Sequence, residues 1–429
     1  MNAADTTWML VSTALVLLMT PALAFFYGGL VRAKNALNTM MMSFVSLGCV
    51  GVAWFILGYS LAFGPGNHVF GDLSALALRG VNLDCASGFT IPRLLFMAYQ
   101  GTFAIITAAL ISGAIVERMR FLAYAAFITL WSLVVYSTVA HWVWSPTGWL
   151  NVMGALDFAG GTVVHITAAT AALVAATLIG PRKDYARQAI LPHNVPFTIL
   201  GAGLLWFGWF GFNGGSALGA NTTAVLAFVN TLIAPSATLL VWTVLDLTRS
   251  GKVTGVGGAT GIVVGLVAIT PAAGFVSPLG ALSIGAIAAV PSYFAILHRS
   301  KTRLDDSLDV VAAHGLGGTV GALLTGVFAS KAWGSPSNGL LHGNPRQFLI
   351  QCVAVGATIA FTAVVTFALL KLVAAFASLK ATHGEEGQGL DFSQHGEEAY
   401  ASGDGALLLL SETLSNEENN LVPSERSAL

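Results

Sequence analysis

The chain has 429 residues, of which 55% are hydrophobic and only 9% are charged, and its formal net charge is −1. Soluble domains carry about 25% charged residues, so most of this chain must face lipid or other apolar helices. The near-zero net charge excludes a strongly basic nucleic-acid-binding protein. The three cysteines lack metal-ligand spacing, so the sequence predicts neither a disulfide framework nor a zinc site.

The hydrophobic pattern predicts an all-α polytopic membrane protein. A membrane-spanning helix needs about 20 mostly apolar residues. Eleven stretches meet this requirement, at residues 8–31, 38–63, 95–116, 121–143, 158–180, 197–217, 222–246, 254–271, 275–297, 309–329 and 346–376. The first stretch could instead be a signal-peptide core, but its leader MNAADTTW has no positive charge and the apolar run continues to Leu30. A first transmembrane helix is therefore the favoured interpretation.

The distribution of basic residues predicts the orientation of the spans. The odd-numbered connections between them carry twelve Lys and Arg residues and the even-numbered connections carry four. Because basic residues concentrate on the cytoplasmic side, the N-terminus is expected outside and the C-terminus in the cytoplasm. We expect a membrane domain at residues 1–379, followed by an acidic cytoplasmic tail at residues 380–429. The tail holds ten of the twenty acidic residues, which favours a solvated, partly disordered segment that either solubilises the protein or docks a partner.

Eleven spans divide into two halves of five, at about residues 8–180 and 197–329, with the eleventh helix left over at 346–376. Two halves with an odd number of spans run in opposite directions, an arrangement that many transporters use. His165 lies in the fifth span and His314 in the tenth, the fifth of the second half. An inverted repeat would bring these two histidines together near the middle of the membrane.

Buried imidazoles are costly in hydrocarbon unless they have a partner or a task. Two neutral histidines can satisfy each other, because one ring N–H donates to the other ring's free nitrogen. The pattern therefore favours a pore-lining pair of His165 and His314, with ordinary packing histidines as the alternative. A metal site would need three or four ligands, and no third residue with suitable spacing is present at membrane depth.

Two aspartates precede the histidines. Asp157 lies eight residues before His165, about 12 Å along a helix, and Asp309 lies five residues before His314. A carboxylate at a helix start accepts hydrogen bonds from free backbone N–H groups. We expect Asp309 to be such a cap, whereas Asp157 could be a cap or could attract a cation above the pore.

Aromatic residues cluster at three span ends that are predicted to face outside. Phe103, Trp144 and Phe212, with Ser216 just beyond, could meet around one outer vestibule. The face of a tryptophan ring attracts a small cation by about 0.5–2 kcal/mol. The alternative is the aromatic belt found at membrane interfaces, which Trp142 and Trp149 fit well.

Long motifs along the chain resemble the ammonium transporter family (Amt/Mep/Rh), in particular its bacterial Amt branch. They run in family order from Phe25 to Tyr400 and read FFYGGLVRAKN, QGTFA, AHWVW, GALDFAGGTVVH, GWFGFNGGSA, AFVNT, ITPAAGF, DVVAAHGLGGTVGALLTG and GLDFSQHGEEAY. The resemblance implies eleven helices, an inverted five-plus-five repeat and a homotrimer in the cytoplasmic (inner) membrane with one pore per subunit. The segment SPTGWLNVMG after Trp144 departs from the family pattern, and residues 401–429 have no family counterpart.

The resemblance also assigns roles to individual residues. Trp144, Phe103 and Ser216 correspond to the outer ammonium recruitment site, and Phe103 with Phe212 to the stacked rings that close the pore. His165 and His314 correspond to the histidine pair of the lumen, and Asp157 to the acidic residue needed for recruitment and conduction. A cytoplasmic trimeric PII signalling protein is the implied partner, which would bind the fifth and ninth connections and GLDFSQHGEEAY.

These assignments predict transport of ammonium, not enzymatic activity, and involve no cofactor. Ammonium would lose a proton at the outer site and pass the apolar lumen as ammonia, a route closed to potassium. An ammonium sensor that signals through its tail is the main alternative. A cation-coupled transporter of another substrate would need a carboxylate at mid-membrane depth, and a membrane enzyme would need a nucleophile or a metal set; neither is evident in the sequence.

Overall fold

The computed structural model describes residues 1–85 and 88–400. These residues form α-, 3-10 and π-helices, with two isolated bridges, Cys85 to Pro92 and Met119 to Lys380, outside the helices. Ten helical stretches are long and apolar enough to cross a membrane, and an eleventh, Gly255–Ile269, is apolar but shorter. Each lies at a position that the sequence predicts, so the prediction of a polytopic helical membrane protein is confirmed.

The first half of the chain contains α1 (Ala3–Leu30), α2 (Ala36–Ala53), α3 (Tyr59–Phe63), α4 (Arg93–Ser112), α5 (Phe121–Trp131), α6 (Ser137–Trp144), α7 (Trp149–Met153) and α8 (Thr167–Ile179). The second half contains α9 (Val195–Gly215), α10 (Thr222–Ser250), α11 (Gly255–Ile269), α12 (Pro278–Arg299) and α13 (Gly317–Phe328), and it is followed by α14 (Pro345–Phe376), α15 (His383–Gln388) and α16 (Leu390–His395). Short π-helical turns precede α8 at Gly161–Ile166 and α13 at Val311–Leu316, and others join α2 to α3 and α5 to α6, at Trp54–Gly58 and Ser132–Tyr136.

The helix starts follow ordinary capping chemistry. The side chains of Asn2, Asn221, Thr254 and Ser277 each accept a backbone N–H at the start of a long helix, which satisfies a donor that the helix itself leaves free. The short α11 begins at its Thr254 cap and ends before Pro271, which cannot continue the N–H ladder. At 15 residues it is about 22 Å long, and a buried loop completes the path to α12.

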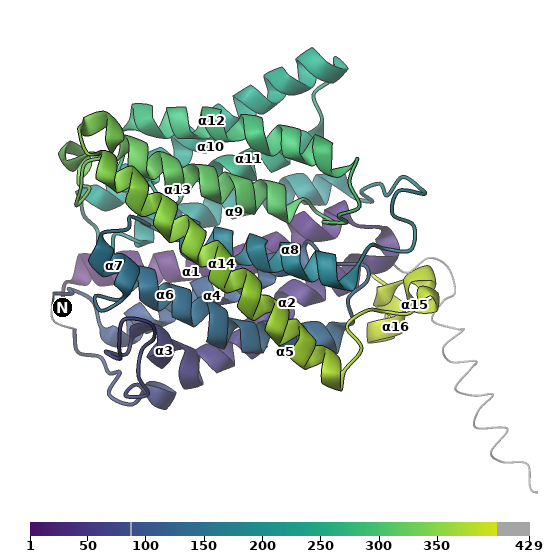
Figure 1. The fold of residues 1–429 in the computed structure, drawn as a ribbon, viewed down its shortest axis with the longest axis horizontal. Coiled ribbons are helices and arrows are strands. Elements are labelled where there is room, and N and C mark those ends of the chain that lie inside the picture. The colour runs from purple at the N-terminus through teal and green to yellow at the C-terminus, as the bar shows by residue number, and fades with distance from the viewer. Residues whose placement is uncertain (86–87, 401–429) are drawn as a thin grey trace, which may run out of the picture.

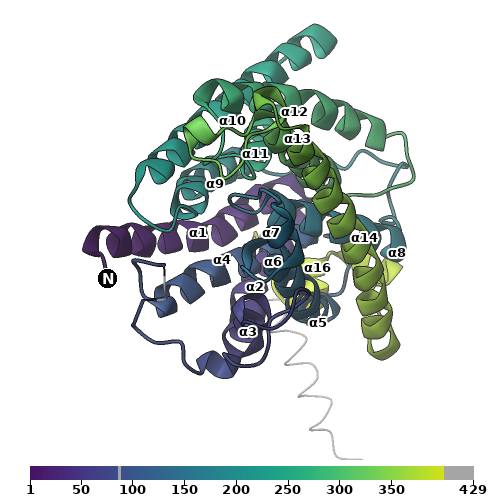
Figure 2. The same cartoon turned by 60° about the vertical axis from the view of Figure 1, so that its left-hand side comes forward.

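The two halves meet along α1 and α9, which pack along most of their length (Figures 1 and 2). Glycines on α9 permit this approach. A methyl group at Gly201 would lie 2.3 Å from the Phe26 backbone nitrogen, and one at Gly208 would lie 2.3 Å from Met19 Cγ. Small residues at helix contacts are typical of membrane proteins, where close backbone packing replaces the hydrophobic effect. The long helix α14 crosses the front of the molecule diagonally, over α8 and α13 (Figure 1).

A buried ionic cluster joins the helix ends at the predicted cytoplasmic side. The Arg182 guanidinium contacts Glu117 at 2.6 Å and Asp305 at 2.7 Å, and Arg32 contacts Glu117 at 3.0 Å. Burial opposes the charged form of Glu117, but the two guanidinium groups hold the pKa of this carboxyl below its usual value. The cluster therefore stays ionised and ties together the ends of α1, α4, α8 and the loop before α13.

The prediction of a solvated tail is wrong for residues 380–395. Both short helices, α15 and α16, pack against the loops on the predicted cytoplasmic side, and Glu386 and Asp391 are each about 2% exposed. The Asp391 carboxylate accepts the backbone N–H groups of Leu37 and Asn38 at the start of α2. Composition indicated solvation, but these carboxylates satisfy helix and loop N–H groups far away in the sequence. Residues 401–429 lie outside the described part of the chain.

Candidate transport site

The outer part of the site is built from the ends of three helices. Trp144 ends α6 and is partly exposed, and its indole N–H donates to the Asp157 carbonyl oxygen at 3.0 Å. The ring of Phe103, on α4, stands edge-on to Trp144 with 6.0 Å between centroids. These contacts fix the indole plane beside Phe103.

Ser216 caps the C-terminal end of α9 and is also partly exposed. Its hydroxyl donates to the Phe212 carbonyl oxygen at 2.8 Å and lies 3.3 Å from the hydroxyl of Tyr99. A hydroxyl has one proton and two acceptor lone pairs. With its proton directed to Phe212, the Ser216 oxygen keeps its lone pairs as hydrogen-bond acceptors.

Phe103 and Phe212 form a stacked pair below this level. Their ring centroids are 4.2 Å apart with an interplanar angle of 29°, and both side chains are about 1% exposed. One ring comes from each half of the chain. Together they separate the outer residues from the histidines, so a molecule passing between the two levels has to displace at least one ring.

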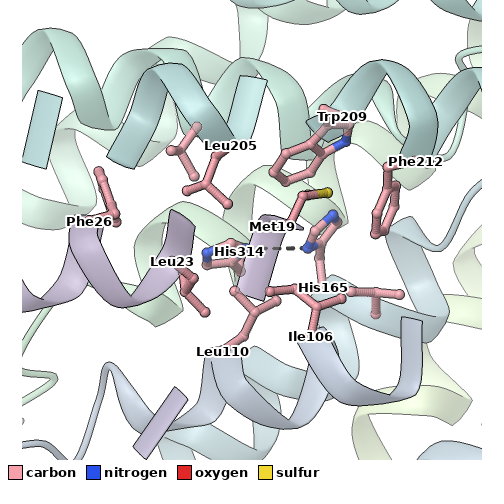
Figure 3. A pocket seen from close by; sticks show the side chains of 12 residues that line it. Met19, Leu23, Phe26, Ile106, Leu110, His165, Leu205, Trp209, Phe212 and His314 are labelled. Atoms are coloured by element: carbon pink, nitrogen blue, oxygen red, sulfur yellow. Dashed lines mark hydrogen bonds between the residues drawn. The ribbon is translucent and has the colours of Figure 1, made fainter. Parts of the chain in front are cut away.

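His165 and His314 face each other beneath the rings (Figure 3), with their Nδ1 atoms 3.2 Å apart. This distance fits one N–H donor and one acceptor, and it therefore fits two neutral imidazoles. Trp209 stacks on His165 with 5.4 Å between centroids, and the indole N–H donates to Thr270. His165 Nε2 is buried and has no partner among the described residues, which leaves it available to a small polar molecule.

The space around the pair is narrow and apolar (Figure 3). Its free volume is about 10 Å³, on the scale of one water-sized molecule. Besides the histidines, it is lined by Met19, Leu23, Phe26, Ile106, Leu110, Val164, Leu205, Trp209, Phe212 and Val263. A single small neutral molecule fits this space, whereas an ion would keep none of its hydration shell.

Asp157 lies between the two levels and points into its own helix start. Its carboxylate accepts four backbone N–H groups, from Gly160, Gly161, Thr162 and Val163, at 2.6–3.0 Å. Gly160 has φ of 111°, a conformation that glycine adopts at little cost, and it turns the chain back over the carboxylate. Of the two roles that the sequence left open, the structure shows the cap.

The prediction that Asp309 caps the tenth span is wrong. Asp309 pairs with Arg299 at 2.5 Å, and the Asp306 carboxylate accepts the N–H groups of Val310 and Val311 instead. Asp306 lies eight residues before His314, as Asp157 lies eight residues before His165. This shared spacing was present in the sequence, and it would have identified the cap had the two halves been aligned on their histidines.

Other parts of the site were missed. Trp209 lies one turn before Phe212, and Tyr99 lies one turn before Phe103, so helical spacing from the predicted residues could have indicated both. The contribution of α1 to the lumen left no such signal, because its residues are ordinary hydrophobes. Within residues 1–85 and 88–400, no three His, Cys, Asp or Glu side chains are placed to share a metal ion.

Known proteins share this architecture. Residues 7–400 match the sequence model of a protein family described as the Ammonium Transporter Family. The chain is 47% identical over 403 residues to an ammonium transporter of Bacillus subtilis, covering 93% of this chain and 99% of that protein. It is 50% identical over 410 residues to an ammonium transporter of Aquifex aeolicus, covering 93% and 94%.

Solved structures agree with these sequence comparisons. The crystal structure of Saccharomyces cerevisiae Mep2 matches with a TM-score of 0.84 and 36% identity, over 89% of this chain and 88% of that chain. A structure described as Sensor Amt Protein matches with a TM-score of 0.84 and 28% identity, over 91% and 98%.

Proposed function

The chain belongs to the ammonium transporter family, and we propose that it carries ammonium across the membrane by binding NH₄⁺ outside, removing one proton and passing NH₃ inward. The observation that carries this proposal is the pair His165 and His314, in contact within a lumen wide enough for one small molecule. A dry, apolar lumen excludes ions, since a charge without partners costs far more to bury than a neutral polar group. Ammonium can become neutral by losing a proton, and potassium cannot.

We propose that NH₄⁺ first binds between Trp144, Phe103 and Ser216. The rings attract a cation by about 0.5–2 kcal/mol, and more once water is removed. Ser216 adds a hydrogen bond that only an ion with N–H groups can donate. Asp157 contributes through its negative charge beneath Trp144, and not through contact, since all four of its hydrogen bonds go to backbone N–H groups.

After deprotonation, the Phe103–Phe212 pair opens for NH₃ and closes behind it. In the lumen, the buried Nε2 of His165 offers a polar contact where the other walls are hydrocarbon. The Nδ1–Nδ1 hydrogen bond holds the two rings facing each other and is compatible with two neutral imidazoles. We propose that the released proton crosses by a separate path, so that each transported ammonium moves one net charge and produces a current.

We infer that the protein works as a homotrimer in the cytoplasmic membrane, with its N-terminus outside, and that a PII-type protein binds its cytoplasmic face. The family resemblance supports the trimer and the partner. The lipid-facing surface of α10 and α12 exposes large apolar side chains such as Val225, Leu240, Leu279 and Phe294, which lipid or a neighbouring subunit would cover. A monomeric mass in native mass spectrometry would refute the trimer.

The transport proposal is tested electrically. The purified protein is reconstituted in liposomes, and currents and internal pH are recorded after jumps of ammonium and, separately, of potassium. We expect a current with ammonium and none with potassium. Ammonium binding without current or change of internal pH would overturn the transport proposal in favour of a sensor.

A further inference from the structure

Gln351 is a buried amide in the middle of the outer half of α14. Its side chain is about 1% exposed and makes three hydrogen bonds to backbone groups of other segments. Oε1 accepts the Leu156 N–H at 2.8 Å, and Nε2 donates to the carbonyl oxygens of Leu156 at 2.7 Å and Ala322 at 3.0 Å. Every donor of the amide is used, so the contact specifies the position of both partners.

The partners also fix how the amide is turned. The N–H of Leu156 requires an oxygen opposite it, and the two carbonyl groups require the NH₂ group. The reversed amide would put an oxygen against two oxygens. Gln347, one turn earlier on α14, is equally buried, and its Nε2 donates to the Gly154 carbonyl oxygen at 2.9 Å and, at the longer distance of 3.5 Å, to Gln351 Oε1. It touches neither Leu156 nor Ala322 through a hydrogen bond.

The two segments that Gln351 joins are those that carry the histidines. Leu156 directly precedes Asp157, whose carboxylate holds the start of the His165 segment and whose carbonyl oxygen receives the Trp144 indole N–H. Ala322 lies eight residues after His314 on the same continuous helix. One side chain on the eleventh helix thus bonds to the start of one histidine helix and to the body of the other.

The surrounding packing brings α14 close enough for this contact. A methyl group at Gly326 on α13 would lie 2.8 Å from Gln351 Cγ, so only glycine leaves room for the glutamine stem. At the neighbouring crossing, a methyl group at Gly318 would lie 3.1 Å from His165 Cβ. Close packing at Gly318 and Gly326 therefore leaves little room for the two histidine segments to move relative to each other.

We propose that Gln351 is a positioning residue for transport, which holds the Asp157–His165 segment in register with the His314 helix. This inference rests on the proposed function of the histidine pair. The physical basis is the cost of leaving buried backbone groups unpaired, which is large where water is absent. Without the amide, the Leu156 peptide would lose both of its partners and shift, and His165 and Trp144 would shift with it.

The test uses the full-length protein in liposomes and compares Gln351→Glu and Gln351→Met with the matched variants Gln347→Glu and Gln347→Met. The ammonium current is divided by the amount of folded protein, measured by size exclusion and thermal unfolding. We expect both Gln351 variants to lose at least about ten-fold in current per folded protein, and both Gln347 variants to stay within about two-fold of the wild type.

The Gln351→Glu variant also provides a pH-dependent current, which a simple loss of protein stability would not produce. Its ionised carboxylate faces two carbonyl oxygens, whereas the protonated acid offers one O–H donor to them. Among the described residues, the titratable side chains near this contact are Asp157, which is turned away into four N–H groups, His165 at the neighbouring helix crossing, and Cys352, the next residue on α14. The current of Gln351→Glu, relative to wild type at each pH, should therefore recover several-fold as the pH falls from 8 to 5, and that of Gln347→Glu should not.

Each outcome has a separate meaning. If the wild type itself gives no ammonium current, the proposed function fails. If the wild type conducts and Gln351→Met or Gln351→Glu conducts equally well per folded protein, the positioning role is overturned. If Gln351→Glu does not fold, Gln351→Met alone decides between the same two results.

Discussion

The segment from Asp157 to His165 and the segment from Asp306 to His314 begin in the same way and lie in different surroundings. Each has a carboxylate that caps a π-helical turn, with a histidine eight residues later. The Asp157 carboxylate is saturated by four N–H groups and touches no charged side chain among the described residues. The Asp306 carboxylate accepts two, and Arg299 and Asp309 lie nearby.

The same eight-residue spacing therefore occurs in two different electrostatic surroundings, one in each half of the chain. At the outer end, backbone geometry and the Gln351 amide fix the segment, so its position does not depend on any titrating neighbour. At the predicted inner end, the Asp306 cap lies beside the Arg299–Asp309 ion pair, and the same region connects through Arg182 to Glu117 and Asp305. We therefore expect the outer end to govern substrate binding and the inner end to respond to pH.

The largest expected effect separates the two caps. Asp157→Ala should lower the ammonium current by at least about 100-fold, since leaving buried N–H groups unpaired costs roughly 1–3 kcal/mol each and each 1.4 kcal/mol is about a factor of ten. Asp306→Ala frees only two N–H groups, half as many, and its current should fall by a smaller factor than that of Asp157→Ala. Equal losses of the ammonium current in liposomes would show that transport depends equally on the two carboxylate caps, and would contradict this prediction.

The second effect concerns stability and pH at the inner end. Burial, together with the neighbouring Asp309 carboxylate, raises the pKa of Asp306 from 3.8 to about 7. A raised carboxyl pKa means that the folded state binds the proton more tightly, so its stabilising contribution is complete below about pH 4 and is lost as the pH rises through about 7. The contribution is at most about 4 kcal/mol. Thermal unfolding midpoints should rise from pH 8 to pH 5 in the wild type, and Asp306→Asn should remove most of that rise.

The smallest effect concerns affinity at the outer end. Ser216→Ala removes one hydrogen-bond acceptor for the bound cation, worth about 1 kcal/mol, and should raise the half-saturating ammonium concentration about five-fold. Arg299→Gln, at the inner end, should leave that concentration unchanged. A five-fold change in both variants, measured by concentration series of the current, would contradict the division of labour between the two ends.

The same contrast explains what the sequence could predict. Long apolar runs and the rarity of polar residues within them were enough to place the spans, and two isolated histidines in matching spans predicted that they meet. Span ends on a common side indicated that Phe103 and Phe212 could lie near each other, whereas their stacking was implied by the family resemblance. These predictions need only the type of each residue and its position along the chain, and they require no knowledge of which distant residues are in contact.

What the sequence could not predict depends on which distant segments touch. Asp306 rather than Asp309 caps the tenth span because the backbone turns back at Asp309, which has φ of 60°. Asp391 is buried because it reaches the start of α2 from more than 350 positions away. Gln351 looks like one polar residue in an apolar helix until Leu156 and Ala322 are placed beside it.

The central claim is that the histidine pair lets ammonia pass and keeps ions out. The most direct measurement is the ammonium and potassium current of His165→Ala beside the wild type in liposomes, with folded, assembled protein verified for both. The account predicts that the variant either loses the ammonium current or gains a potassium current. An unchanged ammonium current without potassium leak would contradict it.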